Sequence, residues 1–365
     1  MQQQTWCSNN AGAVHWTTGT EFGTNRAEWK GESELMKCNL CSMECPDLGP
    51  GETFCGECGH AASEHAGSQP IVPPPVPPQP GPFVQSGSYS AEISRQNPGC
   101  LIFLVDQSGS MNEPIAGGTK PKKDEVADAV QRLLYNTVLR CTKEDGVRPY
   151  FDTGVWTYGG SADVRPAFGT DLLSIREIAE RPKRVESRRR RIPDGAGGVY
   201  EEEFQLPVWF DPVGSGQTPM SAAFRAVVAP LTSWLSQHQA SFPPIIINLT
   251  DGAYTDQSPA TVVRELAQMA TTDGNALVFN CHITQQSGIS VSFPSDTQAS
   301  GLSGLARELY EMSSPLPEPM RRQAQAKGYQ VETGARGYVF NADLVTMIDF
   351  LDIGTRAIQD RMEKA

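Results

Sequence analysis

Residues 100–110 read CLIFLVDQSGS, an unbroken apolar run that ends in an acidic and hydroxyl-rich loop. A short run with no polar position predicts a β-strand that is buried on both faces. Such strands are typical of parallel sheets, because crossover helices then cover both faces of the sheet. This stretch therefore predicts an α/β fold with the strand near its centre and the polar loop at one end.

The sequence on the carboxyl side of this strand continues the same alternation. Short apolar runs with the character of buried strands are separated by amphipathic stretches with helical periodicity. The predicted strands are residues 151–158, 245–250, 276–283 and 337–340, and the predicted helices are residues 122–141, 219–235, 259–270, 302–312 and 342–362. We expect an open, doubly wound and mostly parallel sheet of the Rossmann-like kind.

One segment departs from this alternation. KRVESRRRRI (183–192) and VYEEEFQLPVWF (199–210) flank the turn-forming PDGAGG, which predicts a charged β-hairpin inserted at about 183–210. The arginines at 188–191 could form a nucleic-acid patch, or they could pair with Glu201, Glu202 and Glu203 across the hairpin. Opposite charges that face each other stabilise an antiparallel pair, so we favour the pairing.

Three short loops carry the polar side chains with the clearest chemistry. DQSGS (106–110) follows the first strand, GQTP (216–219) precedes a predicted helix, and LTDG (249–252) ends a central strand. The carboxyl ends of parallel strands share one edge of a sheet, so we expect these loops to converge, with Gly109 allowing a tight bend. Carboxylate and hydroxyl oxygens suit Mg²⁺ or Mn²⁺. The predicted ligands are Asp106, Ser108, Ser110, Thr218 and Asp251.

The charge of this ligand set indicates what such a site is for. Asp106 and Asp251 are its only carboxylates, and the three hydroxyl groups are neutral. A dication held in this way keeps coordination positions for water or for an anion from outside. The residues therefore predict a docking point for an acidic side chain of another protein.

These motifs resemble the metal-ion-dependent adhesion site of von Willebrand factor A (VWA) domains, and the resemblance covers roughly residues 98–362. It implies that Ser108, Ser110 and Thr218 bind the metal directly, and that Asp106 and Asp251 bind it directly or through water. Gln107, where many relatives have a small residue, lies outside the ligand set, and Tyr254 is expected near the rim.

Two motifs, GQTPM at 216–220 and LTDGAYTD at 249–256, resemble those of bacterial intracellular VWA proteins that are encoded beside a protein kinase and a phosphatase of the 2C type, in tellurite-resistance-like or phage-defence cassettes. That resemblance implies a scaffold in a signalling or defence system, with a kinase or phosphatase as partner. The alternatives are a regulatory subunit of a MoxR-type or chelatase AAA+ ATPase, and a nucleic-acid-binding protein that uses a zinc ribbon and the arginine run.

Proline divides the chain. Residues 70–82 read PIVPPPVPPQPGP, which excludes a helix or a sheet interior and is typical of an extended spacer. We therefore expect a cysteine-rich module at 1–67, a linker at 68–97 and the VWA domain at 98–365.

The amino-terminal module has the cysteine spacing of a zinc ribbon. Cys38 and Cys41 form one pair, and Cys55 and Cys58 form another. Two such pairs present four thiolates to a tetrahedral Zn²⁺, and a closed shell of this kind is structural. Other candidates could replace one of these ligands or form a second zinc site: Cys7, His15, Cys45, His60 and His65.

Composition limits the classes of function. The formal net charge of -12 and the pI near 5.0 make nucleic acid an improbable partner. The sequence has no long apolar run, no basic start and none of the nucleotide-binding or hydrolase motifs, so we expect a cytoplasmic protein that neither spans a membrane nor acts as an enzyme. His282, in an apolar strand, is expected to be a packed core residue, and His238 to be solvated.

Overall fold

The computed structural model describes residues 6–8, 14–16, 36–37, 44–45, 87–115, 118–160, 164–193, 199–284, 290–342 and 344–359. The chain divides into two compact units, Met1–Gly81 and Pro82–Ala365. In the first unit the description is confined to two antiparallel pairs, β1 (Trp6–Ser8) with β2 (Val14–Trp16) and β3 (Met36–Lys37) with β4 (Glu44–Cys45).

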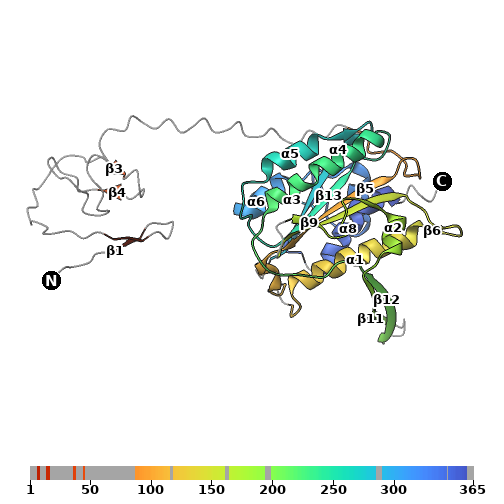
Figure 1. Ribbon diagram of the computed structural model, residues 1–365. Helices are drawn as coiled ribbons and strands as arrows, with labels where there is room; N and C mark the ends of the chain where they lie inside the picture. The colour runs from red at the N-terminus through yellow and green to blue at the C-terminus, as the bar shows by residue number, and fades with distance from the viewer. Residues whose placement is uncertain are drawn as a thin grey trace, which may run out of the picture. The chain divides into compact units, whose positions relative to one another are not determined.

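The second unit is built on a mostly parallel sheet with the order β10-β8-β5-β13-β16-β18-β17 (Figure 1). Its parallel strands are β5 (Gly99–Gln107), β8 (Phe151–Gly159), β13 (Ile245–Thr250), β16 (Leu277–His282) and β18 (Tyr338–Phe340). Three short antiparallel strands lie at the edges: β9 (Val164–Pro166) and β10 (Leu173–Ser174) pair with β8, and β17 (Val291–Ser292) pairs with β18.

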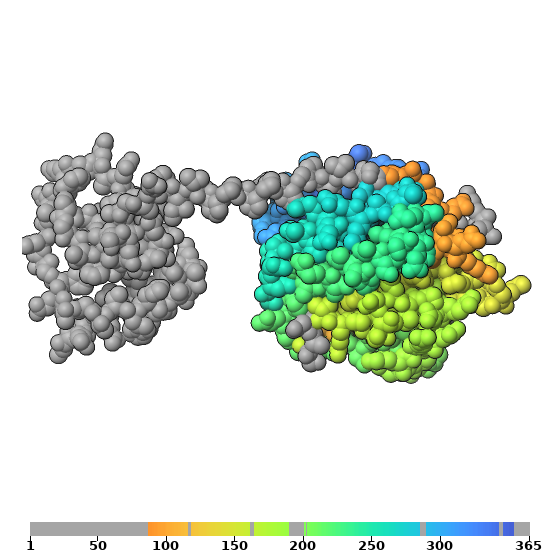
Figure 2. All heavy atoms as spheres, turned by 45° about the horizontal axis from the view of Figure 1, so that its top comes forward, coloured from red at the N-terminus to blue at the C-terminus, as the bar shows by residue number. Residues whose placement is uncertain are grey.

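Helices cover both faces of this sheet. Alternate residues of β5 point to opposite faces, so Leu101 and Phe103 belong to one hydrophobic core while Ile102 and Leu104 belong to the other. The first core includes α1 (Lys122–Cys141), α2 (Ile175–Glu180), α7 (Glu318–Ala326) and α8 (Leu344–Gln359). The second includes α3 (Met220–Ala226), α4 (Val228–Gln237), α5 (Ala260–Gln268) and α6 (Gly304–Glu311). In Figure 2 the green-to-teal atoms of α3, α4 and α5 form one continuous side of the unit.

The α/β class and the alternation expected from the sequence are confirmed, with one helix changed. The expected helix at 219–235 is two helices, α3 and α4, which meet at Val227 (φ -92°, ψ -7°). The sequence analysis missed α2 and α7, which are short or largely polar. It also missed two short strand pairs, β6 (Thr142–Lys143) with β7 (Gly146–Val147) and β14 (Ala270–Thr271) with β15 (Gly274–Asn275), and two 3-10 turns, η2 (Gly109–Asn112) and η3 (Gln298–Gly301).

The charged hairpin is present. It consists of β11 (Arg184–Pro193) and β12 (Val199–Val208), and its register places Arg189, Arg190 and Arg191 opposite Glu203, Glu202 and Glu201. The hairpin and this opposed register are therefore confirmed, and one ion pair across it is described, between Arg189 and Glu201 at 3.7 Å. Arg188 differs: it faces Phe204 in the register, and its guanidinium lies 2.7 Å from the carboxylate of Glu186.

Across the described residues, no helix combines the length and the apolar character needed to cross a bilayer. The three cysteines of the described part of the second unit, Cys100, Cys141 and Cys281, are free and buried. Burial raises the pKa of the Cys281 thiol to about 12.

Candidate functional site

The three polar loops meet at the carboxyl edge of the sheet, as expected. The first loop leaves β5 after Gln107, and the third leaves β13 after Thr250. The second loop is held against the first by backbone hydrogen bonds: the amide of Gly109 donates to the carbonyl of Gly216 at 3.1 Å, and the amide of Ser215 donates to that of Gln107 at 2.9 Å.

Glycine makes this close approach possible, although not at the position expected. Gly159 at the end of β8 has φ +92°, and a Cβ there would lie 2.8 Å from the amide nitrogen of Ser108. Gly216 has φ +74°, and its Cβ would lie 2.6 Å from the carbonyl of Gly160. Both positions exclude a side chain. The expected tight bend at Gly109 is present, because η2 begins there, but Gly109 has no left-handed φ and a Cβ would make only ordinary contacts, so the bend does not require glycine.

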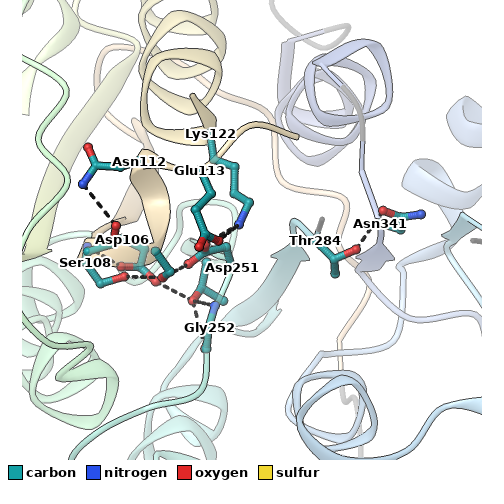
Figure 3. Close-up of polar contacts among 12 residues, drawn as sticks. Asp106, Ser108, Asn112, Glu113, Lys122, Asp251, Gly252, Thr284 and Asn341 are labelled. Carbon is teal, nitrogen blue, oxygen red and sulfur yellow. Dashed lines mark hydrogen bonds and ion pairs between the residues drawn. The ribbon is translucent and has the colours of Figure 1, made fainter. Parts of the chain in front are cut away.

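Four of the five predicted ligands form one hydrogen-bonded group. The hydroxyl oxygens of Ser108 and Ser110 are 3.1 Å apart, and the Ser110 hydroxyl donates to Asp251 Oδ1 at 2.7 Å. The amide of Ser108 donates to Asp106 Oδ1 at 2.8 Å. Figure 3 shows Asp106, Ser108 and Asp251 turned toward a common region at the end of the sheet.

The fifth predicted ligand, Thr218, lies at the same place. A Cβ on Gly252 would lie 3.5 Å from the Ser110 hydroxyl oxygen and 3.9 Å from that of Thr218, so both hydroxyls border Gly252. Two reciprocal hydrogen bonds with Thr255 fix Thr218: its amide donates to Thr255 Oγ1 at 3.0 Å, and the Thr255 amide donates to its carbonyl at 2.9 Å. We call Asp106, Ser108, Ser110, Thr218 and Asp251 the oxygen cluster.

Three further residues that the sequence analysis did not assign complete the surroundings of the oxygen cluster. The Thr250 hydroxyl donates to Asp106 Oδ2 at 2.7 Å. Lys122, at the start of α1, places its ammonium 2.7 Å from Asp251 Oδ2 and 3.5 Å from Glu113 Oε2. The side chains of Lys122 and Asp251 are buried, whereas that of Glu113 is exposed. A lysine in the first turn of a helix looks solvated in sequence, so only the tertiary structure reveals this ion pair.

The electrostatics of the oxygen cluster favour an added cation. Burial raises the pKa of Asp106 to about 6, opposed by hydrogen bonds from Thr250 and Ser108 and assisted by the charge of Asp251. Burial makes the ionised form of Asp106 less favourable, so a positive ion beside the carboxylate would stabilise that form.

The donor set fits a hard divalent cation. Where side chains are described, no group of three or more His, Cys, Asp or Glu residues gathers as a metal site, and the oxygen cluster itself contains two carboxylates and three hydroxyls. Oxygen-only ligands of this kind suit Mg²⁺ or Mn²⁺, not zinc or copper.

The neighbouring residues behave largely as expected. The Gln107 side chain points away from the ligand set and donates to the carbonyl of Asp211 at 3.1 Å. The Tyr254 hydroxyl lies 3.2 Å from Glu308 Oε2. His282 is buried in β16, with Nδ1 3.3 Å from the Tyr338 hydroxyl, and burial lowers its pKa to about 4. His238 is half-buried and stacks on Trp234, so it is less solvated than expected.

The predicted zinc ligands fall largely outside the described residues. This holds for Cys38, Cys41, Cys55, Cys58, His60 and His65. For the remaining candidates only backbone pairing is described, in which Cys7 lies opposite His15 and Cys45 opposite Met36. The zinc site stays a prediction.

No family model matches this sequence, and no curated protein is significantly similar to it. Solved structures give distant similarities. They include proximal thread matrix protein 1 from the mussel byssus (16% identity, TM-score 0.38, 72% of this chain and 49% of that one) and a pilus adhesin, SpaC, from Lactobacillus rhamnosus GG (12%, 0.39, 74% and 32%). A third is the minor pilin PilB from Streptococcus sanguinis (11%, 0.37, 73% and 62%). This chain thus spans less than two thirds of each, and the similarities establish neither its family nor its function.

Proposed function

We propose that the oxygen cluster is a VWA-type metal-ion-dependent adhesion site, which binds one Mg²⁺ or Mn²⁺ ion and through it a carboxylate of a protein partner. The observation that carries the proposal is the convergence of two carboxylates and three hydroxyls from three separate loops on one edge of the sheet.

Charge determines what this site would bind. A bound dication would supply the positive charge that attracts an anion. Asp106 and Asp251 together carry two negative charges, and the Lys122 ammonium beside Asp251 returns one positive charge. Counting only the ion and these three buried groups, the loaded site would carry a net charge of about +1, which favours a carboxylate ligand over a neutral one; the Glu113 carboxylate beside Lys122 is exposed to solvent, which screens its charge. Because the hydroxyls add no negative charge, this net positive charge would remain to attract the partner's carboxylate.

The chain's own residues would orient the ligands. Thr250 holds Asp106 through Oδ2, and Lys122 holds Asp251 through Oδ2, so the Oδ1 atoms of both carboxylates remain with the serines of the first loop. Ser108, Ser110 and Thr218 would present their hydroxyl oxygens to the ion. Fixed ligands of this kind bind with little loss of side-chain freedom.

The wider setting is also part of the proposal. We infer a cytoplasmic, non-enzymatic scaffold in a bacterial signalling or defence system with a kinase and a phosphatase, on the resemblance of the motif GQTPM at 216–220 and the motif LTDGAYTD at 249–256. A metal-dependent docking site in the second unit would suit such a scaffold.

Manganese binding tests the proposal. The full chain, freed of metal with EDTA and dialysed, is titrated with Mn²⁺ by calorimetry, and acetate is then added while the relaxation of water protons by bound Mn²⁺ is measured. We expect one Mn²⁺ per second unit and a decrease in relaxation as acetate displaces water. Asp106→Asn should weaken Mn²⁺ binding at least about tenfold, because it removes a charged ligand.

Asp152→Asn is the matched control. Asp152 is also a carboxylate on a central strand, but it lies at the start of β8 and accepts a hydrogen bond from Trp234 Nε1 at 2.8 Å, away from the oxygen cluster. The Asp152→Asn chain should bind Mn²⁺ with the same affinity as the unaltered chain. Failure of the unaltered chain to bind Mn²⁺, or equal affinity in the Asp106→Asn chain, would refute the adhesion site.

A further inference from the structure

A cleft of about 610 Å³ opens beside the oxygen cluster. Ser110 and Asp251 belong to its lining, so the cleft and the proposed metal site are continuous. Cavities of roughly 300–1,000 Å³ accommodate whole small molecules. A carboxylate alone would therefore leave most of this space unfilled.

The lining beyond the oxygen cluster is mixed: His282, Thr284 and Ser303 are polar, and an apolar part consists of Leu302, Leu305, Ala306 and Phe340. Leu302 follows η3, Leu305 lies in the first turn of α6, and Phe340 ends β18. All three are only half-buried, and Ala306 beside them is buried. Apolar surface that remains accessible in a cleft gains from being covered by an apolar ligand group.

Charged groups also line the same cleft. The buried ammonium of Lys122 and the exposed carboxylate of Glu113 both line it, and they lie next to Asp251 in Figure 3. The ammonium adds to the attraction for one carboxylate at the oxygen cluster. Glu113 would repel a second acidic group, so the cleft suits a single acid joined to an apolar group and not an acidic run.

We propose that the partner of this site presents one aspartate or glutamate beside a bulky apolar residue, whose side chain enters the cleft formed by Leu302, Leu305 and Phe340. This inference rests on the adhesion function proposed above and adds the class of partner. The cleft is the source of sequence preference, because the interaction between metal and carboxylate is the same for every acidic residue.

A series of carboxylates tests the inference. The full chain loaded with Mn²⁺ is titrated with acetate, butyrate and hexanoate, and displacement of water from Mn²⁺ is followed by proton relaxation. Each methylene that is fully buried strengthens binding about fourfold. We expect hexanoate to bind at least about tenfold more tightly than acetate, since the added methylenes enter the cleft.

Two variants locate the gain. Leu305→Ser, or Leu302→Ser if the first fails to fold, should reduce hexanoate binding toward that of acetate while leaving acetate binding unchanged. Leu139→Ser is the matched control, because Leu139 is 52% exposed on α1 and does not line the cleft. It should retain the full preference for hexanoate.

The possible failures are distinguishable. If acetate displaces water but hexanoate binds no more tightly, or if both leucine variants keep the preference, the cleft proposal is wrong while the adhesion site stands. If neither carboxylate displaces water from bound Mn²⁺, the adhesion function itself fails. Hexanoate binding that persists in EDTA would overturn the cleft proposal, because the carboxylate would then not be on the metal.

Discussion

At the scale of single residues, Lys122 places a positive charge where a dication is proposed to bind. Its ammonium is 2.7 Å from Asp251 Oδ2 and its side chain is buried. We expect Lys122→Met to tighten Mn²⁺ binding about tenfold or more, because repulsion between two positive charges in a poorly solvated site is removed. The same change should weaken acetate binding to the loaded site. Calorimetry with Mn²⁺ and then with acetate measures both effects.

Lys123→Met is the control for this prediction. Lys123 is the next residue of α1, and its ammonium contacts Asn112 Oδ1 at 2.8 Å on the exposed surface. Lys123→Met should change neither the affinity for Mn²⁺ nor that for acetate. Affinities for Mn²⁺ and acetate that change in the same direction would contradict the charge argument. A merely structural effect of Lys122→Met, for example, would weaken the binding of both.

His282 makes the stability of the second unit depend on pH. Burial lowers the pKa of its imidazole from 6.5 to about 4, with Lys122 contributing and Asp251 opposing. At a pH between about 4 and 6.5, His282 is protonated in the unfolded chain but not in the folded chain. The folded state therefore loses stability as the pH falls below about 6.5. His282→Gln should reduce this loss by about 2 kcal/mol at pH 5. Urea unfolding of both chains at pH 8 and pH 5 measures it, and equal losses would contradict a buried neutral imidazole.

At the scale of elements, the strands and helices with strong apolar periodicity were predictable. The expected strand around 100–106 and the expected helix at 122–141 are present as β5 and α1. The break at Val227 was not predictable, because the apolar spacing continues through it and the packing of α3 and α4 decides where one helix ends. Short α2 and α7 carry too few apolar positions for a periodicity to emerge.

The convergence of the five oxygen-bearing side chains was predictable for a different reason. Oxygen donors that follow strand ends are local in sequence, and the topology of a parallel sheet brings the strand ends together. The residues that hold the oxygen cluster were not predictable, because Lys122 and Thr255 act across loops that meet only in the fold.

Helix α3, which follows the loop that carries Thr218, is fixed at its amino end. Its first amides are capped from another loop: the amides of Ser221 and Ala222 donate to Asp256 Oδ1 at 3.2 Å and Oδ2 at 2.9 Å. Asp256→Ala should cost about 1 kcal/mol of stability and lower Mn²⁺ affinity about tenfold, because the cap also fixes the loop that carries Thr218. Ser174→Ala removes the cap of α2 instead, so it should cost similar stability but leave Mn²⁺ binding intact. If the two variants had equal effects on Mn²⁺ affinity, Asp256 would have no specific role in positioning the Thr218 loop.

At the scale of the whole molecule, the two compact units make the two predicted metal sites separable. The oxygen cluster lies entirely within Pro82–Ala365, and the predicted zinc ligands lie entirely within Met1–Gly81. The contacts that hold the oxygen cluster among described residues also lie within the second unit. We therefore expect the oxygen cluster to bind metal independently of the cysteines.

A fragment of residues 82–365 tests this separation, with elemental analysis and Mn²⁺ calorimetry as the measurements. We expect the full chain to retain bound zinc and the fragment to lack it, while both bind Mn²⁺ with the same affinity. Cys55→Ser in the full chain should lose zinc without affecting Mn²⁺, because a structural zinc shell needs all four ligands. Zinc that remains in the fragment would contradict the predicted ligands, and a fragment that folds but fails to bind Mn²⁺ would mean that the oxygen cluster depends on the first unit.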